Sequence, residues 1–282
     1  MNVQARQAHG YVEAVGGVRL HYRSWEATRP HAALLVLHGL GEHSGRYLQL
    51  GASMVDHEIS TFALDLRGHG VSEGRRGYVA RFEMFLQDVD RFRREVQGLV
   101  DPSCPLFLLG HGLGGLVVLR YLEEYAPAFR GGIVLAPWVA TALPLARWKA
   151  NLAAFLSRLL PALPLRAGIR AQDLSHDEDV VRTYRADALV HDTITPRLFT
   201  ELSIAMGLVL QRADRLATPL LFLLPGSDRI SDTARTAAFA RSLPAASVDI
   251  EVFPGFYHEL LNELERATVR ARIRDWIAAR CA

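Results

Sequence analysis

The sequence contains almost no lysine. Of the 32 basic residues in the 282-residue chain, only Lys149 is a lysine, so arginine carries nearly all of the positive charge. An arginine fork suits phosphate and carboxylate groups. These arginines are scattered, however, and codon usage explains their excess better than a binding site does. With 30 acidic residues the formal net charge is +2. The charge balance therefore does not indicate a basic surface for nucleic acid, and we expect no nucleic-acid partner.

Cysteine and long apolar runs are scarce too. Cys104 and Cys281 lie far apart in the sequence, which does not suggest a disulfide framework, and we expect two free thiols in a reducing compartment. No stretch of about 18 uninterrupted apolar residues indicates a transmembrane helix. The first ten residues are polar and lack the apolar centre of a secretory signal. Together these features predict a cytoplasmic protein.

Short apolar segments alternate with helical patterns along most of the chain. Strand-like segments occupy residues 11–25 (two strands around the turn at Gly16 and Gly17), 31–39, 61–68, 105–110, 131–137, 219–226 and 247–255. Helical spacing covers residues 47–57, 81–100, 116–125 and about 267–279. This alternation is typical of an α/β fold with a mainly parallel sheet and helices on both faces.

One segment interrupts the alternation. From about residue 140 to 217 we find helical patterns and no good strand, which predicts a helical cap over residues 138–210, inserted into a core of residues 1–137 and 211–282. Residues 147–165 are apolar along one helical face, through Trp148, Leu152, Phe155, Leu156 and Leu159. Two interpretations stay open: the face touches the substrate's acyl chain or, transiently, a membrane surface, or it packs on the rest of the cap.

The stretch GHGLGG, residues 110–115, is a glycine-rich turn between a predicted strand and a predicted helix. Its spacing fits the dinucleotide fingerprint G-x-G-x-x-G, and it also fits the nucleophile elbow G-x-S-x-G apart from Gly112 at the centre. The fingerprint needs a carboxylate at the end of the next strand. That strand ends in VLAPWV, which has none, so the elbow is the better interpretation.

An α/β-hydrolase places its nucleophile, acid and histidine in that order along the chain. Asp228 follows the strand at 219–226 and His258 follows the strand at 247–255. Both therefore come to the edge of the sheet where ligands bind. Asp232 is a rival acid, but its position fits less well. The backbone amides of Leu40, after an early strand, and Leu113, after the elbow, could together form an oxyanion hole.

Five stretches occur in the order found in the monoacylglycerol lipase and lysophospholipase-like α/β-hydrolases, and the chain resembles that family. They are HGLGEHSGRY (38–47), DLRGHGVSEG (65–74), GHGLGG (110–115), GSDRISD (226–232) and FYHELLNE (256–263). The resemblance implies a serine hydrolase that cleaves fatty acyl esters of glycerol or related alcohols with no metal and no organic cofactor. It assigns Asp228 and His258 to the catalytic triad and Leu40 and Leu113 to the oxyanion hole.

The resemblance also implies a pocket around Gly39, Glu42, Arg46 and His111. A surface ion pair four residues apart explains Glu42 and Arg46 equally well, and His111 suits packing beneath the elbow better than reacting. His38 and His43 invite a metal site, but no third ligand stands at a useful spacing.

The chain departs from the family at the centre of the site. Gly112 has no hydroxyl for His258 to activate, so no acyl-enzyme forms there, although glycine keeps the strained turn. Three hypotheses follow: an ester hydrolase in a nucleophile-less form, natural or engineered; a non-catalytic protein that binds a lipid-like ligand; or a hydrolase in which His258 acts as general base on water. The pattern is silent on acyl length and oligomeric state.

Overall fold

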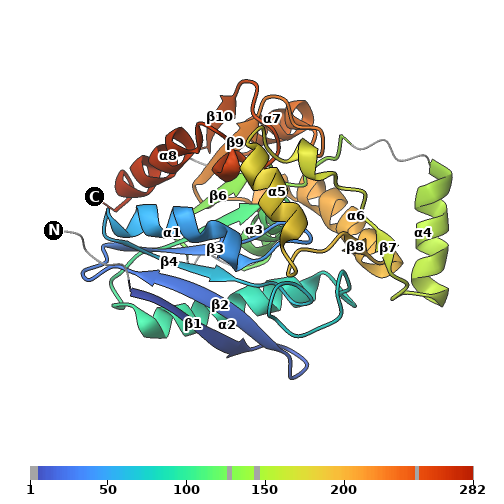
Figure 1. Cartoon of the computed structure of the whole chain (residues 1–282), viewed down its shortest axis with the longest axis horizontal. Coiled ribbons are helices and arrows are strands. Elements are labelled where there is room, and N and C mark those ends of the chain that lie inside the picture. Colours follow the sequence, from blue (N-terminus) through green and yellow to red (C-terminus); the bar gives the residue numbers. More distant parts are fainter. Residues whose placement is uncertain (1–5, 126–128, 143–146, 245–247, 282) are drawn as a thin grey trace.

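An eight-stranded sheet forms the centre of the molecule, as Figure 1 shows. This computed structural model describes residues 6–125, 129–142, 147–244 and 248–281. The sheet order is β1-β2-β4-β3-β5-β6-β9-β10, and β2 runs antiparallel to both of its neighbours while the other pairs are parallel. The strands are β1 (Arg6–Glu13), β2 (Arg19–Glu26), β3 (Ala32–Leu37), β4 (Ile59–Leu64), β5 (Leu106–His111), β6 (Gly131–Leu135), β9 (Leu220–Pro225) and β10 (Val248–Phe253).

Helices cover both faces of this sheet, which confirms the predicted α/β-hydrolase architecture. Helices α1 (Leu48–Val55) and α8 (Arg266–Ala278) pack on one face, and α2 (Glu83–Leu99), α3 (Leu113–Glu124) and α7 (Thr233–Arg241) pack on the other. The central strand β3 is buried throughout and sends alternate side chains to the two cores. A strand covered on both faces has to be apolar at every position, as this one is.

The amphipathic helix predicted over residues 81–100 is α2. Its predicted apolar stripe is fully buried, comprising Phe85, Leu86, Val89, Phe92 and Val96, with Phe82 just before the helix. The helix predicted at 47–57 is α1, preceded by a 3₁₀ turn, η1 (Ser44–Tyr47). The last predicted strand is β10, and Ser247 at its predicted start lies outside the described residues.

Between β6 and β9 the chain leaves the sheet, and we call residues 136–219 the insertion. Its elements are α4 (Arg147–Leu159), β7 (Leu165–Arg166), η2 (Ala171–Asp173), α5 (Glu178–Ala186), β8 (Thr193–Ile194), α6 (Pro196–Gln211) and η3 (Ala213–Arg215). Two of these correct the expectation of no strand here: β7 and β8 form a short antiparallel pair. Two paired residues on each side are too few to leave a periodic signal in the sequence.

Side-chain caps set the helix starts of the insertion. The Asp177 carboxylate accepts from backbone amides at the start of α5, and the Thr195 hydroxyl does so for α6, which has Pro196 in its first turn. Helix α6 packs on α3, and α4 packs on α6. Helix α4 stands at the end of the molecule opposite the two termini (Figure 1). The predicted cap boundaries, 138 and 210, remain a prediction, and residues 143–146 within them lie outside the described part.

The sheet topology opens a crevice at one edge. Strand β3 lies between β4 and β5, so the chain reverses the direction in which it adds strands after β4. The loops that follow β3 and β5 therefore separate, as they do at ligand sites of open α/β sheets. In the described part of the chain, no helix is both long enough and apolar enough to cross a bilayer. Cys104 and Cys281 are free thiols, as predicted.

Candidate active site

The glycine-rich turn joins β5 to α3 with an unusual backbone at Gly112. The residue has φ 53° and ψ −112°, a region that side chains rarely adopt. Its amide donates to the Leu135 carbonyl at 3.0 Å, and its carbonyl accepts from the Trp138 amide at 3.1 Å. These two hydrogen bonds fasten the turn to the loop after β6.

Close packing accounts for the other three glycines of this stretch. A Cβ on Gly110, Gly114 or Gly115 would lie between 2.2 and 2.8 Å from its nearest neighbour, which no real Cβ does. At Gly112 the nearest atom to such a Cβ would be Nε2 of His258, at 3.4 Å. The central position therefore has room for a side chain, and that side chain would face an imidazole.

His258 and Asp228 form a buried pair. Nδ1 of His258 lies 2.8 Å from Oδ2 of Asp228, whose Oδ1 accepts from the amides of Ile230 at 2.8 Å and Ser231 at 3.1 Å. Burial alone would raise the pKa of the Asp228 carboxyl. The charge and hydrogen bond of His258, helped by the two amides, outweigh burial and lower it. A charged Asp228 fixes the imidazole with Nε2 turned toward Gly112.

Asp232, the alternative candidate for the acid, is the N-cap residue of α7. Its carboxylate accepts from the Arg235 amide at 2.9 Å and caps the first turn of α7. Stabilising the helix start is enough to explain an aspartate at this position. The structure brings Asp228 and not Asp232 to the histidine.

The two expected oxyanion donors flank the elbow. Leu40 follows β3 and lines the same small cavity as Gly112, and Leu113 is the first residue of α3. Amides in the first turn of a helix have no partner within the helix, so that of Leu113 suits a developing negative charge. Gly39 lies beside them, with its Cα 3.8 Å from a Cβ built on Gly112. A larger residue at 39 would crowd Glu42, whose Oε1 accepts from the Gly39 amide at 2.5 Å.

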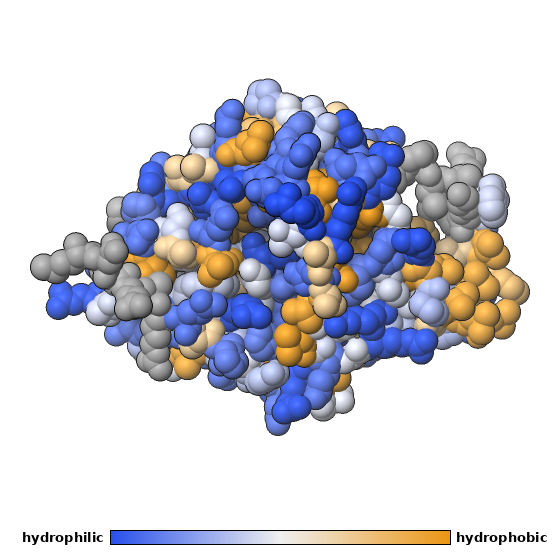
Figure 2. Space-filling model, viewed as in Figure 1, coloured by the Kyte–Doolittle hydropathy of each residue, from blue (hydrophilic) through white to orange (hydrophobic). Residues whose placement is uncertain are grey.

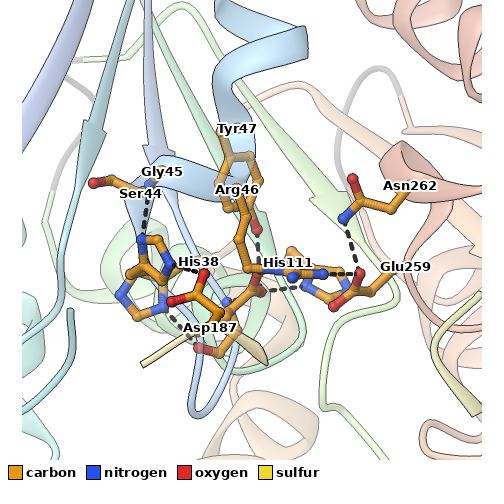
Figure 3. Close-up of polar contacts among 12 residues, drawn as sticks. His38, Ser44, Gly45, Arg46, Tyr47, His111, Asp187, Glu259 and Asn262 are labelled. Atoms are coloured by element: carbon orange, nitrogen blue, oxygen red, sulfur yellow. Dashed lines mark hydrogen bonds and ion pairs between the residues drawn. The ribbon is translucent and has the colours of Figure 1, made fainter. Parts of the chain in front are cut away.

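A buried charge network lies beneath the elbow (Figure 3). Glu42 Oε1 is 2.9 Å from Nδ1 of His111, and Glu42 Oε2 is 3.3 Å from Nε of Arg46. Arg46 also pairs with Glu259, the residue after His258. Both Glu42 and the Arg46 side chain are more than nine-tenths buried, which excludes a surface ion pair. The two residues instead form a buried ion pair next to His111.

His111 links this network to the pair of His258 and Asp228. Its Nε2 lies 3.3 Å from the His258 carbonyl, while its Nδ1 faces Glu42. Burial alone would lower the pKa of His111, but the hydrogen bond and charge of Glu42 outweigh it and raise the pKa. The same contacts and the nearby Arg46 lower the pKa of Glu42 against the effect of its burial. The packing role expected for His111 thus includes a polar contact on either side of the ring.

Comparison with known proteins places this geometry in a family. The model of the family described as serine aminopeptidase, S33, matches residues 28–265. The monoacylglycerol lipase of Mycolicibacterium smegmatis is 30% identical over 279 residues, covering 97% of this chain and 98% of that protein. The chain belongs to this hydrolase family. The resemblance inferred from the five sequence motifs is therefore confirmed.

Other members of this hydrolase family agree with that assignment. The monoglyceride lipase of Homo sapiens is 32% identical over 275 residues, covering 94% of this chain and 89% of that protein. The crystal structure of the Paleococcus ferrophilus monoacylglycerol lipase matches with a TM-score of 0.85 at 29% identity, over 93% of this chain and 99% of the other. A soluble variant of the Saccharomyces cerevisiae monoglyceride lipase, solved with a substrate analogue, has the same fold at 19% identity. The hydrolase fold and the broad esterase and lipase class are thus established.

The insertion lies over the candidate site. Ile169, Leu174 and Tyr184 from the insertion line the cavity at Gly112, whose volume is about 20 Å³. Further contacts hold the insertion down: Asp187 pairs with His43 at 2.9 Å, and the His191 amide donates to the Gly41 carbonyl at 2.9 Å. A cavity of that size admits roughly one water.

Sequence reasoning missed several residues of the site. Glu259 follows His258 directly and could have been suspected as the buried partner of Arg46. Tyr184 and Asp187 belong to the insertion, and no local pattern connects them to the core. Trp138 closely follows a strand, and its segment, VLAPWV, was used only to reject the dinucleotide fingerprint. In the part of the chain that the structure describes, no group of three or more His, Cys, Asp and Glu side chains is arranged to hold a metal ion.

The packing at the elbow predicts that Gly112 and Gly114 respond differently to a methyl group. Gly112→Ala should lower the free energy of unfolding by about 1 kcal/mol, because only the positive φ opposes it. Gly114→Ala should lower it by about 3 kcal/mol, because the added Cβ meets the Leu37 carbonyl oxygen at 2.2 Å. Urea unfolding of the two variants measures both values. Equal losses would mean that position 112 is not shaped for a side chain.

The raised pKa of His111 predicts a pH-dependent difference in stability. A raised folded-state pKa contributes stability that is complete below the unfolded pKa and disappears as the pH rises through the folded pKa. His111→Gln should therefore cost about 1–3 kcal/mol in acid, where the charged hydrogen bond exists, and less at alkaline pH. Unfolding of both proteins at about pH 5.5 and pH 9, on either side of an ordinary histidine pKa, measures the difference. A difference independent of pH would contradict a raised pKa of His111.

Proposed function

We propose that the chain has the site of a carboxylic ester hydrolase of the monoacylglycerol lipase or lysophospholipase type, acting by a Ser–His–Asp mechanism but without its serine. One observation carries the proposal. A Cβ on Gly112 would lie 3.4 Å from Nε2 of His258, whose other ring nitrogen is 2.8 Å from Asp228. A serine hydroxyl at that position would lie within reach of a histidine already oriented by a carboxylate.

The mechanism follows from this arrangement. With serine at position 112, Nε2 of His258 takes the hydroxyl proton as the oxygen attacks the ester carbonyl. Asp228 holds the tautomer and stabilises the imidazolium, and the amides of Leu40 and Leu113 receive the oxyanion. His258 then returns the proton to the leaving alcohol. With Gly112 no acyl-enzyme forms, so the chain as written is inactive or nearly so by this route.

Binding without catalysis is the second candidate. The missing hydroxyl favours it, since a site without its nucleophile still retains the pocket and the overlying insertion. The ligand would again be a lipid-like ester or alcohol, by analogy with the lipase relatives. The preserved pairing of His258 with Asp228 favours the hydrolase, because binding alone does not require an oriented base.

The surface of the insertion supports a lipid-like substrate. Side chains on one face of α4 are exposed, with Trp148 at 63%, Leu152 at 45%, Phe155 at 59% and Leu159 at 62%. Figure 2 shows apolar side chains gathered over this end of the molecule. Packing within the insertion is the other interpretation that the sequence left open, and it leaves Leu152, Phe155 and Leu159 exposed. We propose that the insertion is a cap and that this face of α4 rests transiently on a lipid surface.

Restoring the nucleophile tests the proposed hydrolase. Gly112→Ser should raise hydrolysis of short acyl esters and monoacylglycerols at least about a thousandfold over the chain as written, because a triad lacking one member retains only small activity. A fluorophosphonate probe should label the serine variant and not the chain as written. Adding His258→Ala should abolish both gains. A folded serine variant with neither activity nor labelling would reject the site as described.

Vesicle binding tests the proposed contact of α4. Phe155→Glu combined with Leu159→Glu should weaken binding to phosphatidylcholine vesicles by about tenfold or more, because two large apolar side chains no longer enter the interface. The matched control is Tyr11→Glu combined with Leu99→Glu, two exposed apolar residues outside the insertion. Cosedimentation compares the two pairs, and thermal melts check folding. Equal binding, or a dimer that only the α4 pair disrupts, would contradict a lipid contact.

A further inference from the structure

A second polar group faces the nucleophile position. The indole Nε1 of Trp138 lies 3.9 Å from a Cβ built on Gly112, close to the 3.4 Å of His258 Nε2. This N–H is buried, and among the residues that the structure describes it has no hydrogen-bond acceptor. Tryptophan can only donate, and a buried donor without an acceptor is rare in native proteins. An acceptor at the nucleophile position would satisfy this donor.

The fold holds Trp138 firmly in this place. Its amide donates to the Gly112 carbonyl at 3.1 Å, so the indole and the elbow move together. Two residues earlier, Ala136 has a φ of 43°, which turns the chain sharply after β6. The Ala136 carbonyl accepts from the buried hydroxyl of Ser231 at 3.0 Å. The backbone that carries the indole is thus fixed from both sides.

The space between these groups suits one neutral oxygen. The cavity that Gly112, Trp138 and His258 line has a volume of about 20 Å³, enough for roughly one water. Two carboxylates, Glu42 and Glu259, also line it, and both are paired with cations. Among the described residues that line the cavity, no unpaired positive charge is left to hold an anion. A water fits, because it can accept from Trp138 and donate to His258.

We propose that Trp138 is a positioning residue that holds a water as the nucleophile beside Gly112, so that the chain as written hydrolyses activated esters directly. This inference rests on the proposed function, because it uses the same His258, Asp228 and oxyanion donors. It adds a residue that the serine mechanism does not assign. It also replaces the two-step route through an acyl-enzyme by a single displacement.

The reaction balances without a co-reactant other than water. The water oxygen forms a bond to the ester carbonyl carbon while one of its protons passes to Nε2 of His258. The carbonyl oxygen becomes an oxyanion held by the amides of Leu40 and Leu113. When this intermediate collapses, the carbon–alkoxy bond breaks and the alkoxide takes the proton from His258. The products are one carboxylic acid and one alcohol, and the residues return to their starting state.

The indole donor gives the water a productive orientation. One lone pair of the oxygen accepts from Trp138 and one hydrogen points to His258. The remaining lone pair is free to attack the carbonyl carbon. A serine oxygen needs no such help, because a covalent bond to Cβ already fixes it. Loss of the indole should therefore matter more with Gly112 than with serine.

A two-by-two set of variants tests this difference. Trp138→Phe is made in the chain as written and in Gly112→Ser, and kcat/KM for p-nitrophenyl acetate is measured in all four proteins. Trp138→Phe should lower activity about tenfold with Gly112 and less than about threefold with serine, as expected for losing one hydrogen bond to a mobile water. His258→Ala should abolish the activity of the chain as written. A purely structural role for Trp138 would lower both backgrounds equally and overturn the inference.

A high-resolution crystal structure of the chain as written provides a test that needs no variant. An ordered water should lie within about 3.2 Å of both Trp138 Nε1 and His258 Nε2. A carboxylate there, or no water, would overturn the inference, and so would activity that survives His258→Ala. These failures are separate from failure of the proposed function. An active Gly112→Ser variant keeps the serine mechanism even if Trp138 is irrelevant, whereas an inactive one rejects that mechanism whatever Trp138 does.

Discussion

The close approach of helix α3 to the sheet is the constraint on which the site depends. A Cβ on Gly114 would stand 2.2 Å from the Leu37 carbonyl oxygen, and one on Gly115 would stand 2.8 Å from Pro137. Because the helix starts this close to β3 and to the loop after β6, the residue before it has to turn through a positive φ. That turn directs position 112 toward His258 and brings the first amide of α3 to the crevice. The geometry of the elbow thus comes from packing, independently of the group that performs the chemistry.

Buried charge connects the three loops that meet at this elbow. Glu42 follows β3, His111 ends β5, and Glu259 follows β10, with Arg46 joining the two carboxylates. Burying such pairs gives little net stability, because desolvation offsets the attraction. Breaking one pair leaves a charge without a partner, which is far worse. The network therefore fixes the relative positions of the loops, and His111 extends it to the His258 carbonyl.

The sequence predicted the sheet well because its signals are local. Each buried parallel strand is an apolar run, and α2 carries a complete stripe, so element type follows from periodicity alone. The order of motifs likewise placed Asp228 and His258 at neighbouring strand ends. Burial of Glu42 and Arg46 was undecided, because i, i+4 spacing is the same on a surface and in an interior. Trp138, Tyr184 and Asp187 could not be found, since their roles depend on how the insertion and the loop after β6 fold back on the elbow.

Gly112 separates what the fold needs from what the reaction needs. Glycine relieves the strain of the turn and removes the hydroxyl, and neither change disturbs the pairing of His258 with Asp228. The preserved pairing of His258 with Asp228 therefore does not show that an acyl-enzyme can form in this chain. The indole of Trp138 is a separate observation, because a buried donor without an acceptor costs about 1–3 kcal/mol. An oxygen at the nucleophile position would remove that cost, whether it belongs to a serine or to a water.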